Sequence, residues 1–171
     1  MLDKLYITPR QWLQILRWAL YSLLFLSVMM VQTVVLGNRT VFGTHPSFVP
    51  IVITCVCLRE GAERGGHFAL LASLFWCLSG ADLGSMSILI LTVLPVLGAL
   101  LCKAMLNNRF LPCLAISFLT LACDQFIGFL LKYFFGHIPA ALFTRELLPC
   151  VFLSILSQPL LYWLVKCIAK I

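Results

Sequence analysis

The sequence predicts an all-α integral membrane protein, a single domain in which six transmembrane helices form a bundle. Composition is the first reason: of 171 residues, 62% are hydrophobic and 11% are charged, against roughly 45–50% and about 25% in soluble domains. The mean hydropathy of +1.05 is the second, because a soluble protein of this length could not bury so much apolar surface. Length is the third, since about 20 residues per crossing helix leave room for five or six spans.

The first span is expected at about 9–36. Thr8 suits a helix N-cap and Pro9 suits the first helical position, while Trp12 and Trp18 suit the membrane interface. A cleaved signal peptide is the competing interpretation, because basic residues precede the apolar run. No small-residue cleavage site follows that run, so we interpret the segment as a span.

The second and third spans are expected at about 46–58 and 61–78, although their apolar stretches are short. A re-entrant hairpin, about half a bilayer deep, is the alternative. Small residues recur once per turn along the third segment, at Gly61, Gly65, Ala69, Ser73 and Cys77. Such a stripe lets a neighbouring helix approach closely in lipid. It favours one continuous third helix, with Gly65, Ala69 and Ser73 as candidate interaction residues.

The remaining spans are expected at about 86–102, 110–131 and 147–165. The segment 79–84, with two glycines, is typical of a tight turn before the fourth span. Pro95 predicts a bend in the fourth span and Pro159 a kink in the sixth. A loop is expected at 132–146.

The basic residues predict the orientation. With six spans and a cytoplasmic N-terminus, nine of the 12 Lys and Arg residues are cytoplasmic and three are outside, as the positive-inside rule predicts. A re-entrant hairpin would instead place Arg59 and Arg64 within the membrane, at high cost. Both termini are therefore expected in the cytoplasm. The net charge of +6 does not indicate nucleic-acid binding, because the basic residues lie between apolar runs.

The eight cysteines indicate packing rather than chemistry. None forms a Cys-x-x-Cys pair, and no histidine lies at metal-ligand spacing from one. We interpret them as small apolar residues, and the sequence predicts neither a metal site nor a cofactor.

Asp124 is the acidic residue inside an apolar span, and such residues are functional candidates by default. Counting inward from the outer ends of the fifth and sixth spans places Ser154 at its depth, with Gln158 one turn further. We expect a structural hydrogen bond between Asp124 and these two residues. A functional role for the carboxylate is the alternative.

Arg59, Glu60, Glu63 and Arg64 form a mixed-charge cluster at the inner face. The cluster is either a solvated loop with weak local ion pairs or a docking patch for a cytoplasmic partner. The sequence has no Walker loop, nucleophile elbow or His-Glu-x-x-His motif. It gives no indication of an enzyme.

The segment order and several local patterns resemble the MreD-type rod shape-determining proteins of the bacterial inner membrane. The matching residues are Val31-Gln32-Thr33-Val34, Phe42-Gly43, Pro46, Gly65, Ala69, Ser73, Phe75-Trp76, the turn Gly80–Gly84 and Pro159-Leu160-Leu161. One position departs from the family, whose members often carry an acid directly after this tryptophan. Here the position is Cys77, and Asp82 follows five residues later.

The resemblance implies a non-enzymatic subunit of the cell-elongation complex, which maintains cell shape and organises peptidoglycan synthesis. Its implied partners are MreC, the MreB filament and the RodA–penicillin-binding-protein synthase, within membrane lipids. The implied fold is similar to that of the substrate-binding subunits of energy-coupling-factor vitamin transporters, and such a subunit is the alternative function. Those subunits typically carry an Ala-x-x-x-Ala docking pattern in the first span, whereas here Leu23 follows Ala19.

Overall fold

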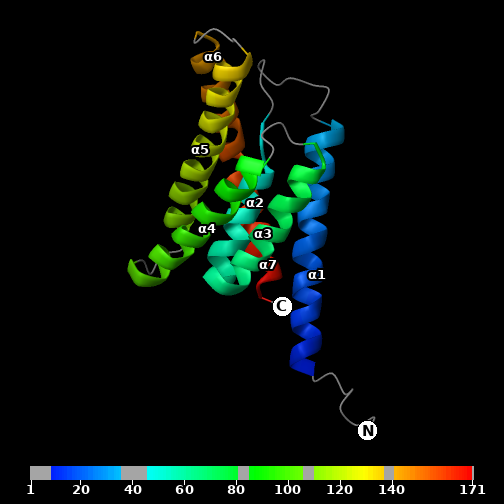
Figure 1. The fold of residues 1–171 in the computed structure, drawn as a ribbon. Helices are drawn as coiled ribbons and strands as arrows, with labels where there is room; N and C mark the ends of the chain where they lie inside the picture. Colours follow the sequence, from blue (N-terminus) through cyan, green and yellow to red (C-terminus); the bar gives the residue numbers. More distant parts are fainter. Residues whose placement is uncertain (1–8, 36–45, 81–84, 106–109, 137–140, 171) are drawn as a thin grey trace.

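The structure is a computed structural model that describes residues 9–35, 46–80, 85–105, 110–136 and 141–170 (Figure 1). Every regular element in these ranges is a helix. The helices are α1 (Pro9–Met30), the π-helix η2 (Val31–Val35), α2 (Val49–Glu60), α3 (Ala62–Leu78), α4 (Ser85–Met105), α5 (Phe110–Gly136), α6 (Ala141–Leu156) and α7 (Gln158–Ile168).

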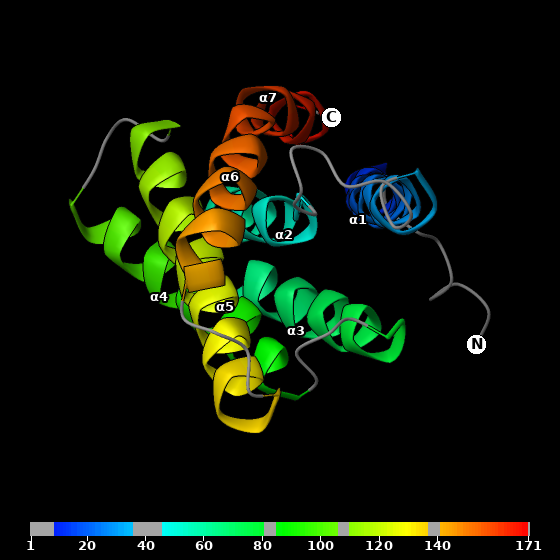
Figure 2. The same cartoon turned by 90° about the horizontal axis from the view of Figure 1, so that it is seen from above.

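The helices α1 to α6 run in alternating directions along the bundle, and α7 continues in the direction of α6 (Figure 1). The start of α1, the turn between α2 and α3, and the end of α7 therefore lie at one end of the molecule (Figure 1). We call this the proximal end. Seen along the bundle, α2 occupies the middle, with the other helices arranged around it (Figure 2). It contacts α1, α3, α4, α5 and α7.

The core is built around α2. All nine residues from Val49 to Cys57 are buried, which matches a helix whose side chains are apolar on every face. Around it pack buried side chains from the other helices, among them Tyr21, Phe25, Phe68, Leu91, Leu121, Leu161 and Val165. The mid-bundle position of α2 thus follows directly from its composition.

Within the residues that the structure describes, four stretches are long and apolar enough to cross a membrane: Gln11–Val34, Met86–Lys103, Phe110–Leu131 and Pro149–Ile168. The segments expected at 46–58 and 61–78 form two separate helices, α2 and α3, joined at Gly61. At 12 and 17 residues, these helices are about 18 and 26 Å long, shorter than a hydrocarbon layer of about 30 Å. They form a helical hairpin inside the bundle.

The later helices differ in extent from the expected spans. α5 continues to Gly136 and α6 begins at Ala141, so most of the loop expected at 132–146 is helical. The aromatic residues after Lys132 prolong the helix, and Tyr133 stacks on Phe129 one turn earlier, with ring centroids 6.2 Å apart. α4 is helical through Pro95. The sixth expected span breaks at Ser157, and Pro159 lies in the first turn of α7.

α1 lies at the periphery, and polar contacts from its middle and from η2 hold it to the two ends of α2. Near the proximal end, Glu60 Oε1 accepts hydrogen bonds from Tyr21 Oη at 2.8 Å and from Arg17 Nη1 at 3.4 Å. At the other end, Gln32 in η2 accepts the backbone N–H groups of Phe48 and Val49 through its Oε1, at 2.9 and 3.1 Å. These contacts fix the position of α1 against both ends of α2.

Candidate functional site

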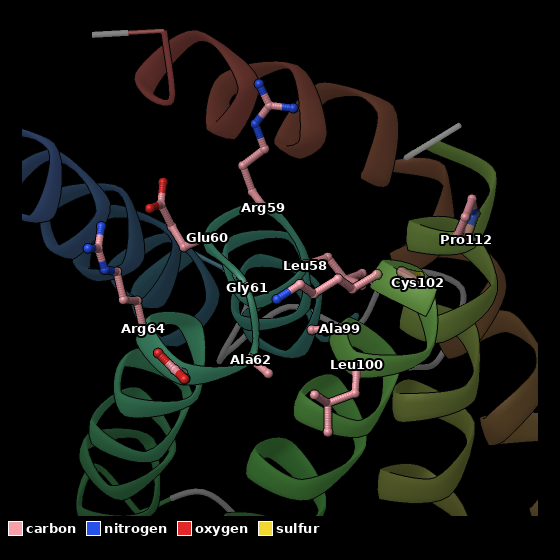
Figure 3. Close-up of a pocket in the computed structure, with 12 residues that line it drawn as sticks. Leu58, Arg59, Glu60, Gly61, Ala62, Arg64, Ala99, Leu100, Cys102 and Pro112 are labelled. Atoms are coloured by element: carbon pink, nitrogen blue, oxygen red, sulfur yellow. The ribbon is translucent and has the colours of Figure 1, made fainter. Parts of the chain in front are cut away.

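A hollow of about 610 Å³ opens at the proximal end, beside the turn between α2 and α3 (Figure 3). Four helices, α2 to α5, contribute its walls. The lining residues are Leu58, Arg59, Glu60, Gly61, Ala62, Glu63, Arg64, Ala99, Leu100, Cys102, Lys103 and Pro112. The hollow therefore includes the whole mixed-charge cluster from the sequence and adds Lys103 from α4.

Two glycines shape this turn. Gly61 has a φ of +92°, a conformation that other residues rarely adopt, and it reverses the chain between the helices. A Cβ atom on Gly65 would lie 2.5 Å from the Cα of Cys57, so α3 begins in backbone contact with α2. The close approach predicted from the small-residue stripe is thus present at Gly65.

The rest of the stripe contacts a different neighbour. Ala69 and Ser73 are fully buried, and the Oγ of Ser73 lies 3.1 Å from the Oγ1 of Thr92 on α4. The stripe therefore meets α2 at its start and α4 further along. Gly98, which the sequence analysis did not single out, makes a similar approach, since a Cβ there would lie 2.7 Å from the side chain of Ile116.

Glu60 is already engaged within the protein. Its carboxylate accepts hydrogen bonds from Arg17 and Tyr21 of α1, and its side chain is only 7% exposed. The structure therefore does not show the expected ion pairs within the mixed-charge cluster. Gly61 ends α2 before Arg64, so Glu60 and Arg64 do not share a helix face at a spacing of four residues.

The remaining charged side chains surround the hollow. Figure 3 shows Arg59 and Arg64 pointing away from one another, toward different sides. Glu63, Arg64 and Lys103 are exposed. Within the described ranges, the one ion pair is that of Arg17 with Glu60. Three cations and one carboxylate at the hollow thus have no charged partner within the described part of the chain.

Asp124 has a different partner from the expected one. The Oγ of Ser87 on α4 donates to its Oδ1 at 2.7 Å, and both residues are buried, with exposures of 3% and 1%. The prediction that Asp124 forms hydrogen bonds with Ser154 and Gln158 is wrong. Counting residues fixes the depth of a side chain but not its direction around the helix, and Asp124 faces α4 rather than α6.

Ser154 and Gln158 join other pairs of segments. Ser154 Oγ donates to the backbone oxygen of Cys150 and accepts the N–H of Ser47 at 2.9 Å, just before α2 begins. Gln158 Nε2 donates to Ser117 Oγ at 3.2 Å. Both residues are fully buried. Their role in the described structure is to connect helices through hydrogen bonds.

Gln158 Nε2 also lies 3.8 Å from the Sγ of Cys113. That sulfur in turn lies 3.4 Å from the Sγ of Cys55 on α2. This spacing is a thiol contact, since a disulfide would need about 2.05 Å. No group of three or more His, Cys, Asp or Glu side chains in the described ranges has a geometry that could hold a metal ion.

A second, apolar groove of about 460 Å³ runs between α1 and α7. Leucines from both helices supply half of its lining, with Val28, Val31, Phe48 and Ile168 as further apolar residues. Its two hydroxyls, on Ser27 and Ser157, donate to the backbone oxygens of Leu23 and Ser154, at 2.8 and 2.7 Å. The groove therefore suits the aliphatic chains of membrane lipids.

Comparison of the chain with protein-family models, with curated proteins and with solved structures finds no match.

Proposed function

We propose that this chain is a non-enzymatic, multi-pass subunit of the bacterial cell-elongation complex, of the MreD type. In this role it helps to maintain cell shape and to organise peptidoglycan synthesis in the inner membrane. Its partners are MreC, the MreB filament and the RodA–penicillin-binding-protein synthase. The proposal begins from the sequence resemblance, and one feature of the structure carries it further.

That feature is the charged hollow at the proximal end. Its rim carries exposed residues of both signs, and exposed charges of this kind govern partner choice and encounter more than they enclose a substrate. The hollow also lies between helices that the core holds firmly around α2. A rigid, charged recess of this kind suits a scaffold that positions other proteins.

The distribution of basic residues supports a cytoplasmic proximal end. Arg59, Lys103 and Lys166 lie near the ends of α2, α4 and α7, and all three helices end on this side. By the positive-inside rule, this side faces the cytoplasm. We therefore propose six membrane passages with both termini inside, in which the hairpin of α2 and α3 supplies the second and third passages.

The interior polar groups support a structural rather than a catalytic role. Asp124 accepts a hydrogen bond from Ser87, Ser154 accepts one from Ser47, and Gln158 donates to Ser117. Each bond joins two different segments of the chain. In a membrane, such bonds set the arrangement of helices.

The vitamin-transporter alternative has less support. A small polar ligand needs an enclosed pocket with a few convergent hydrogen-bonding groups. The groove between α1 and α7 is apolar, and the hollow opens on the side that we assign to the cytoplasm. Neither feature has the character expected of an external vitamin site.

Complementation tests the proposal. The chain is expressed in a rod-shaped bacterium depleted of its own MreD protein, and cell width is measured by microscopy. We expect rod shape to return and MreC and the synthase to co-purify with the chain in mild detergent. Round cells at matched expression, or co-purification with transporter subunits in place of MreC, would overturn the assignment.

A further inference from the structure

The hollow has more positive than negative side chains when those already paired within the protein are set aside. Glu60 is neutralised by Arg17 and is nearly buried. Arg59, Arg64 and Lys103 then face Glu63 as the single remaining acid of the lining. The hollow therefore presents an excess of positive charge to whatever enters it.

These positive charges are spread out rather than convergent. Arg59 and Arg64 belong to different helices and point away from one another (Figure 3), while Lys103 comes from α4 on the facing wall. A single phosphate group is bound best by donors that converge on it. Separated cations instead match several carboxylates spaced along an extended chain.

Part of the lining of the hollow is apolar. Leu58, Ala99 and Leu100 contribute to the lining, and Leu100 is 51% exposed. An apolar side chain of a partner placed over these three residues would remove their surface from water, which is favourable. Apolar surface beneath a charged rim is typical of the centre of a protein interface.

We infer that the hollow binds an acidic segment of a cytoplasmic protein partner, in which an apolar side chain is flanked by carboxylates. The apolar side chain lies over Leu100, and the carboxylates meet Arg59, Arg64 and Lys103. This inference rests on the proposed function and adds the chemistry of the docking partner.

The test uses the full chain in nanodiscs of phosphatidylcholine and a fluorescent peptide, Glu-Glu-Leu-Glu-Glu. Binding is measured by fluorescence anisotropy, with Gln-Gln-Leu-Gln-Gln as the uncharged control peptide. We expect only the acidic peptide to bind, and its binding to weaken as salt rises from about 0.05 to about 0.3 M. Equal binding of both peptides would overturn the inference.

Variants locate the site. Lys103→Glu alone should weaken binding several-fold, and the triple variant R59Q/R64Q/K103Q on the order of tenfold, because exposed ion pairs contribute little singly. Lys166→Glu is the matched control, since it makes the same charge change in the last turn of α7, outside the lining. Unchanged melting temperatures establish that each variant is folded. An equal loss in K166E and K103E would show general attraction to a basic surface and overturn the inference.

Nanodiscs that contain anionic lipid distinguish a protein partner from lipid headgroups, the other source of negative charge. If adding phosphatidylglycerol to the nanodiscs displaces the peptide from the wild type, the hollow belongs to lipid headgroups and the inference fails. The proposed function is tested separately. A chain that restores rod shape and co-purifies with MreC but does not bind the acidic peptide would support the proposed function and contradict the inference about the partner.

Discussion

α1 and α2 are both apolar helices, yet different interactions hold them. α2 is buried along nine consecutive residues and touches five neighbouring helices. α1 exposes most of its length. Its rings of Trp18, Tyr21 and Phe25 pack against Phe68 of α3, and polar contacts join α1 and η2 to the two ends of α2. Lipid tails are as apolar as the helix surface, so burial alone gives α1 little reason to stay in one place. The comparison teaches that packing fixes the central helix and hydrogen bonds fix the peripheral one.

The largest difference should appear when the same side chain is shortened in each helix. Ile53→Ala removes a fully buried side chain from α2 and should cost about 2–5 kcal/mol of stability. Ile15→Ala in α1 changes a side chain that is 51% exposed, and its effect should be close to zero. Thermal melting in detergent measures both. Similar costs would mean that α1 is packed as α2 is.

A second prediction concerns the contact between α2 and α3. Gly65→Ala places a methyl group against the backbone of Cys57 and should cost about 1–3 kcal/mol. Gly66→Ala is the matched control, because its methyl would meet one side-chain atom, Cγ2 of Val96 at 3.1 Å, and no backbone of a neighbouring helix. The same melting assay applies. If both variants melt alike, the helices can separate slightly and the close approach does not limit stability.

The third prediction tests the buried acid. Asp124→Asn keeps an oxygen that accepts the Ser87 hydroxyl, so stability should be nearly retained. Asp124→Leu leaves that hydroxyl without its acceptor and should cost about 1–3 kcal/mol. Complementation with the Asn variant supplies an independent readout. Loss of rod shape at an unchanged melting temperature would show that ionisation of Asp124 matters, and would revive its functional interpretation.

The fourth prediction weakens one anchor of α1. Gln32→Ala removes the acceptor for the N–H groups of Phe48 and Val49, and should cost about 0.5–2 kcal/mol, as for other N-cap losses. Thr33→Ala is the control, since its hydroxyl bonds only to the backbone of its own segment. The accessibility of a cysteine introduced into α1 near η2 should rise only in the first variant. No rise would mean that packing holds this end.

The smallest effect is expected at the other anchor. Glu60→Gln keeps an oxygen for Tyr21 and loses only the charge opposite Arg17. The pair is partly exposed, so the change should cost less than about 1 kcal/mol. Glu63→Gln, an exposed residue without a partner in the described ranges, is the control. A loss above that range would make the charge of Glu60 a principal support of α1.

The sequence was sufficient for the helical class and for the approximate bounds of the first four spans, but not for the extent of α5 and α6 or for the break at Ser157. The small-residue stripe through Gly65 indicated the close approach, because side-chain size is a local property. Gly61 was assigned to the third helix by the same stripe, whereas it forms the turn before that helix. The direction of Asp124 was missed, since spacing along one helix does not say which neighbour it faces. Part of the lining of the hollow was predicted. Its mixed-charge cluster is contiguous in sequence, whereas Lys103 joins the lining only because α4 packs beside that cluster.

The start of α2 shows how the folding of distant parts of the chain is coupled. Three amide groups, on Ser47, Phe48 and Val49, lie where α2 begins inside the bundle, and side chains of Ser154 and Gln32 accept their hydrogen bonds. Backbone donors at membrane depth need such acceptors, because no water replaces them. Gln32 is synthesised before α2, but Ser154 leaves the ribosome more than a hundred residues later. Until then, this helix end lacks one acceptor, so its final placement in the membrane has to wait for nearly the whole chain to be made.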